Sequence, residues 1–165
     1  MDKVAKAAEA LTRALMKGDT LLYAQVKAIT GDTCTVTIGQ LELTDVRLKA
    51  TDDGNQDKLL VVPAVGSMVM VGANNGSLRD LVVLKVDDPE VISYKHKDVL
   101  VNINAKTGLM EVKNQHKSLK ALFDDLMTII EQLTVSTPAG PSGTPLPPTL
   151  AQVAQFKADL SKILK

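Results

Sequence analysis

The sequence has 165 residues, of which 45% are hydrophobic but only 2% aromatic, and its 19 basic and 19 acidic residues give a formal net charge of zero. Such a length supports one modest domain with appendages, or two very small domains. Proteins that bind nucleic acid usually carry an excess of basic residues, and they hold single strands on aromatic side chains, so we expect no nucleic-acid partner.

The single cysteine, Cys34, excludes a disulfide within the chain and fits a reducing compartment. It lies in an alternating segment, where we expect it to be a small buried apolar residue. We expect no targeting segment and no stable membrane span. The sequence therefore predicts a protein made in the cytoplasm, with a different final location if it is carried within a virion or a tail-like particle.

The first segment, residues 1–18, is predicted to be a helix from Asp2 to Lys17. Its apolar residues recur at spacings of three and four, and Gly18 follows as a C-terminal glycine should. The apolar stripe is narrow and rich in alanine, so this helix needs a docking surface to be stable.

The next segment, residues 19–88, has a hydrophobic period of two and is predicted to form an OB-like β-barrel. Glycine and asparagine turn signals separate its short apolar runs. An SH3-like barrel would give a similar pattern. The expected strands are 21–29, 33–38, 41–48, 58–62, 67–71 and 80–86.

Residues 89–114 contain three short strand repeats, at 91–94, 99–103 and 109–112. Strands this short cannot bury their own apolar faces. They either pack against equivalent strands of another chain or extend the barrel, and the sequence leaves both arrangements open. The candidate residues of intertwined strands are Val99, Val101, Ile103, Met110 and Val112.

Residues 115–165 are predicted to form a helix, a loop rich in proline and glycine, and a second helix. The first helix carries apolar residues at alternating spacings of three and four over about two heptads. This seam fits either a single amphipathic helix on a domain or an oligomeric bundle. The candidate self-association seam consists of Leu119, Leu122, Leu126, Ile129 and Leu133.

The loop over residues 136–148 is expected to be a linker or an ordered extended segment, without helix or sheet. Thr149 and Gln152 have the spacing of a capping box and predict that the last helix spans about residues 150–164. Two amphipathic helices joined in this way indicate an antiparallel hairpin with the apolar faces together.

The sequence shows no catalytic constellation, and we expect no enzyme, no cofactor and no metal site. His96 and His116 each lie in a polar segment with lysines and are expected to be solvated. Neither has metal-ligand spacing to Cys34. The acidic run 51–57 could suggest a calcium loop, but its carboxylates do not match an EF-hand, and a soluble hairpin turn explains it more simply.

Several segments together resemble the OB-fold domain of baseplate central-spike or hub proteins of contractile phage tails and related injection systems. They are Ala24-Gln25-Val26, Cys34-Thr35-Val36, Thr44 to Leu48, and Pro63 to Val71. The resemblance implies a homotrimer in which the strands after the barrel wind with two other chains into a needle, and it implies other baseplate or tail proteins as partners. The strand segment is short here and no His-x-His pair is available for a metal, so a hub or assembly platform fits better than a membrane-piercing tip.

The expected fold class is mainly β with flanking helices (α+β). The expected function is that of a non-catalytic, self-assembling structural protein of a phage-tail-like or injection-system baseplate, spike or hub. The alternative is a generic OB-fold binding or scaffold module for protein, oligonucleotide or carbohydrate.

Overall fold

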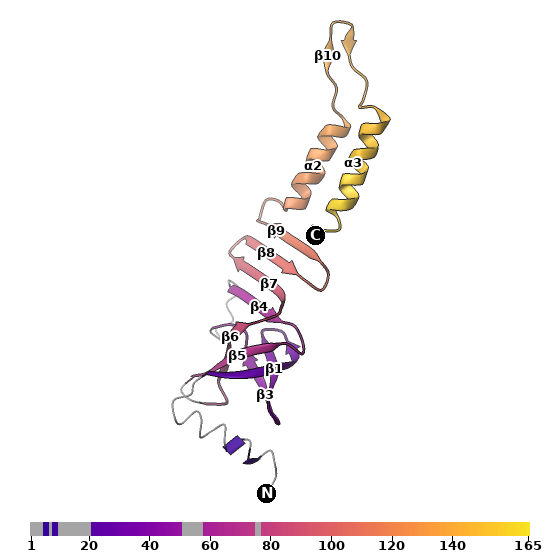
Figure 1. The fold of residues 1–165 in the computed structure, drawn as a ribbon. Coiled ribbons are helices and arrows are strands. Elements are labelled where there is room, and N and C mark those ends of the chain that lie inside the picture. Colours follow the sequence, from indigo (N-terminus) through magenta and orange to yellow (C-terminus); the bar gives the residue numbers. More distant parts are fainter. Residues whose placement is uncertain (1–4, 7, 10–20, 51–57, 75–76) are drawn as a thin grey trace. The chain divides into compact units, whose positions relative to one another are not determined.

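The computed structural model describes residues 5–6, 8–9, 21–50, 58–74 and 77–165 (Figure 1). Residues 5, 6, 8 and 9 are helical; the rest of the helix expected over residues 2–17, and the acidic run 51–57, lie outside the described residues. The fold is mainly β with helices, as expected. It divides into two compact units, Met1–Tyr94 and Lys95–Lys165.

The first unit contains a closed β-barrel with the strand order β1-β2-β3-β6-β5. Neighbouring strands are antiparallel, except that β3 and β6 run parallel. The OB-like barrel expected from the sequence is therefore present. Its strands are β1 (Leu21–Thr30), β2 (Thr33–Ile38), β3 (Leu41–Arg47), β5 (Met68–Ala73) and β6 (Leu81–Val86).

Small aliphatic side chains fill the interior of the barrel. In β1 and β2 the buried residues alternate with more exposed ones, because successive side chains point to opposite faces of a strand. No buried side chain in the described part of the chain is polar or charged. A narrow barrel filled by valine explains why the protein folds with so few aromatic residues; the side chains buried most deeply include Val26, Val36, Val46, Val69 and Val71.

Two features of the backbone close and bend the barrel strands. Gly31 and Gly39 connect β1 to β2 and β2 to β3 with φ of 59° and 63°, a conformation that glycine adopts without strain. Asp45 also has a positive φ, of 59°, at a place where the register between β2 and β3 shifts. Such a bulge bends the strand and re-aims its side chains.

A second sheet contains four strands in the order β4-β7-β8-β9. Its strands are β4 (Lys58–Pro63), β7 (Pro89–His96), β8 (Val99–Asn104) and β9 (Leu109–Lys113). The strand expected at 58–62 exists, but its expected place in the barrel was wrong, since it pairs outside the barrel as β4. Alternation along one strand gives the faces of that strand, and the choice of a distant partner depends on the whole fold.

The second unit contains two helices, α2 (Leu119–Glu131) and α3 (Pro147–Leu160). Ser118 caps α2, because its side chain accepts a hydrogen bond of 3.1 Å from the backbone N–H of Ala121. The helices run side by side as an antiparallel hairpin (Figure 1). Between them the rings of Phe123 and Phe156 lie 6.2 Å apart.

The expected boundaries of the last helix were wrong. It begins at Pro147 and ends at Leu160, and its N-cap is Leu146, which makes no side-chain hydrogen bond. The capping box of Thr149 and Gln152 is therefore not formed. Proline lacks an N–H and has a φ suited to a helix, so the prolines at its first two positions start α3 without a capping side chain.

The loop between the helices is ordered, but the expectation that it contains no sheet was wrong. It forms a small hairpin of β10 (Ser136–Thr137) and β11 (Gly140–Pro141). The Ser142 N–H donates to the Val135 carbonyl at 2.7 Å, and the Thr137 hydroxyl donates to the Gly140 carbonyl at 2.6 Å. These local hydrogen bonds give a proline-rich segment a defined conformation.

Candidate functional site

Four of the seam residues lie on one face of α2, Leu133 follows two residues after the helix ends, and all five are open to solvent. Their relative exposures range from 37% at Leu119 to 63% at Ile129. Phe123 contacts Phe156 of α3, and Met127, one turn later on the same face of α2, is buried. The expectation of apolar faces packed together therefore holds for this face and was wrong for the seam. Among the described residues, α3 thus packs on one apolar face of α2, while the seam face stays largely open to solvent.

The residues expected in intertwined strands also share one face, on the hairpin of β8 and β9. Val101 pairs with Val112 and Ile103 pairs with Met110, so the two strands present these side chains to the same side. Val99 joins them by the alternation of β8. Four of the five are exposed and Val101 is half-buried. The structure therefore places the five residues together as one apolar sheet face.

A groove of about 250 Å³ connects the sheet face to the seam. Val99 and Val112 line it from the hairpin, and Leu119 and Leu122 line it from the first turns of α2. Four of the ten candidate residues thus line one groove, and we call the ten residues together the apolar face of the second unit. Two residues from each of two separate sequence patterns, one of period two and one of heptad spacing, meet at this groove.

The charged residues beside the apolar face are paired within the chain. Lys120 contacts Asp124 at 3.0 Å, one helical turn away, and Lys117 contacts Asp125. Exposed pairs of this kind contribute little to stability. They do, however, balance the charge of these four side chains beside the apolar face.

The barrel carries a second feature, a broad polar depression that the sequence patterns did not reveal. Its volume is about 860 Å³, and three separate chain segments line it, namely the β1–β2 turn, the end of β3 and the connection from β5 to β6. Its lining residues are Gly31, Asp32, Thr33, Asp45, Arg47, Lys49, Asn74, Arg79 and Asp80.

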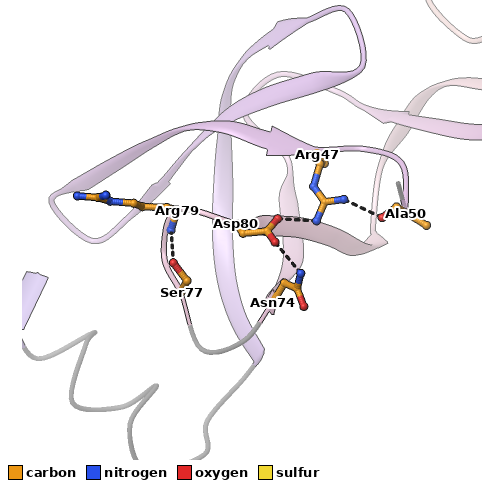
Figure 2. A network of polar contacts seen from close by, with 6 residues as sticks. All are labelled: Arg47, Ala50, Asn74, Ser77, Arg79 and Asp80. Atoms are coloured by element: carbon orange, nitrogen blue, oxygen red, sulfur yellow. Dashed lines mark hydrogen bonds and ion pairs between the residues drawn. The ribbon is translucent and has the colours of Figure 1, made fainter. Parts of the chain in front are cut away.

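Asp32 pairs with Lys49 and Lys58, and Figure 2 shows a second set of contacts in this polar depression, around Asp80. Asp80 accepts hydrogen bonds from Asn74 at 2.6 Å and from Arg47 at 2.5 Å, and Arg47 also donates to the Ala50 carbonyl at 2.7 Å. The bond from Asn74, followed by that from Arg47, lowers the pKa of Asp80. The Arg79 side chain extends away from this network.

The single cysteine and the two histidines do not form a site with one another. Burial raises the pKa of the Cys34 thiol to about 11. His96 and His116 are both exposed, as expected. Within the described ranges, no three His, Cys, Asp or Glu side chains gather as metal ligands, and no helix is long and apolar enough to cross a membrane.

No protein-family model matches this chain, and no curated protein matches it in sequence. A function therefore has to be inferred from its own residues. The OB-like barrel alone does not assign one, because folds of this kind host many unrelated functions.

Proposed function

We propose that this chain is a non-catalytic structural protein that assembles with copies of itself, as a spike, hub or platform component of a phage-tail-like or injection-system baseplate. The observation that supports this most strongly is the apolar face. It joins the exposed seam of α2 to the exposed apolar side of the β8–β9 hairpin through a lined groove.

Exposed apolar residues are common singly, but a connected patch on a small unit indicates an interaction surface. The seam has heptad spacing, with leucine at each a position and Ile129 at the second d position. Leucine at a combined with isoleucine at d favours trimers or tetramers over dimers, and the seam has this combination at one of its two d positions, the other being Leu122. Three copies arranged about one axis would bury both parts of the apolar face, which agrees with the trimer that the sequence resemblance implies.

Cross-linking through an introduced cysteine tests this arrangement. The native Cys34 is buried, so a cysteine at Leu133, at the open end of the seam, is the reactive thiol of the variant. We expect Leu133→Cys to give a covalent trimer with a three-armed maleimide. Ala151→Cys, on the exposed side of α3, is the matched control and should stay mostly single-chain. Equal yields from both variants at low protein concentration would contradict the proposal.

The polar depression on the barrel supports a second candidate, a binding module for an oligonucleotide or carbohydrate. It lies where strand ends and connecting turns meet, a region that OB-folds use for such ligands. A gel-shift assay with a labelled oligonucleotide at moderate salt separates the two candidates. The structural proposal predicts no shift, whereas a shift that Arg79→Ala abolishes would favour the binding module.

A further inference from the structure

The outer edge of β9 is paired with another segment of the second unit. The Met110 N–H donates to the Ile163 carbonyl at 2.7 Å, and the Met110 carbonyl accepts from the Lys165 N–H at 2.9 Å. Residues 163–165 thus lie parallel to β9, with Leu164 opposite Met110. Because β9 is the last strand in the order of its sheet, this contact covers an edge that would otherwise be open.

Both backbone hydrogen bonds and a buried side chain hold residues 163–165 in place. Leu164 is only 7% exposed, and its N–H donates to the Leu160 carbonyl at the end of α3 at 2.8 Å. Farther along β9, Lys113 forms an antiparallel bridge with Ser118, just before α2. Two different segments therefore protect the edge, one near Met110 and one near Lys113.

An open strand edge is a template for adding another strand, and uncontrolled addition produces aggregates. The danger is greatest when a protein is also brought together with its own copies through a neighbouring surface. We infer that residues 163–165 act as a guard strand, which closes β9 so that copies meet through side-chain faces and not through strand addition. This inference rests on the proposed self-assembly and concerns its mode, but it does not depend on the baseplate role.

Replacing Lys165 with proline tests the guard strand by removing one backbone hydrogen bond. Proline lacks the N–H that bonds the Met110 carbonyl. Lys165→Ala removes the same side chain but keeps the N–H, and is the matched control. We expect Lys165→Pro to speed hydrogen exchange at the Met110 amide about fivefold, the effect of losing one ordinary hydrogen bond.

The second readout is the mass distribution. We expect Lys165→Pro to form species that grow with concentration and bind thioflavin T, while Lys165→Ala keeps the wild-type mass. Leu164→Ala, compared with Ile163→Ala at a half-exposed position, gives a second pair in case proline disturbs α3. If each test variant shows the same hydrogen exchange and the same mass distribution as its control, the guard-strand inference is wrong. The mass of the wild-type protein separately tests the proposed assembly.

Discussion

Replacing Ile129 with alanine separates assembly from folding. In the single chain 63% of this residue is exposed, so most of its apolar surface is available to another copy. Full burial of such a side chain stabilises by about 1.5 to 3 kcal/mol, so we expect the substitution to remove about 1 kcal/mol per copy and about 3 kcal/mol per trimer. The trimerisation constant should fall about a hundredfold.

The same substitution should leave the isolated chain as stable as before, or slightly more stable, because alanine favours a helix more than isoleucine does. Sedimentation equilibrium measures the trimerisation constant, and circular dichroism at high dilution measures the helix. Thr128→Ala, at an exposed position outside the seam, is the control. If Ile129→Ala associates as tightly as Thr128→Ala, the seam does not hold the copies together.

Three further results are expected. Met127 is 6% exposed at the α2–α3 contact, so Met127→Ala should lower the free energy of unfolding by about 2 to 4 kcal/mol in urea titrations, in contrast to Ile129→Ala. Lys58 donates a hydrogen bond to Asp32 and lowers the pKa of that carboxyl, so the pair stabilises the fold above about pH 4 and its contribution is lost as the pH falls through the folded-state pKa. Lys58→Met should accordingly be less stable than wild type at pH 7, with a gap in unfolding free energy that narrows below about pH 4; an equal gap at every pH would contradict the pairing. Burial raises the pKa of the Cys34 thiol to about 11, so Ellman's reagent at pH 8 should label this residue only after denaturation, and rapid labelling of the folded protein would show that it is accessible.

Local patterns predicted much of the fold. The bounds of β2 follow directly from the alternation between Thr33 and Ile38, and the start of α2 follows from its heptad spacing at Leu119. Such patterns report which side of an element is apolar, and this holds before any partner is known. For that reason the candidate seam and sheet-face residues could be identified from the sequence.

Other features depend on contacts between distant residues and could not be predicted. Alternation gave β4 its faces but not its partner, and two prolines started α3 where a capping box three residues later looked equally suitable. The polar depression combines Asp32, Arg47 and Asp80 from three separate segments. The guard strand likewise joins Met110 to residues more than fifty positions away, with no motif to mark either segment.

The most direct test of self-assembly is the solution mass of the wild-type protein by light scattering over a concentration series. The proposed assembly predicts a mass near three times the chain mass of 17.6 kDa, held constant as the protein is diluted into the low micromolar range. A mass of 17.6 kDa at every concentration would contradict it, and the exposed apolar face would then have to serve a different partner.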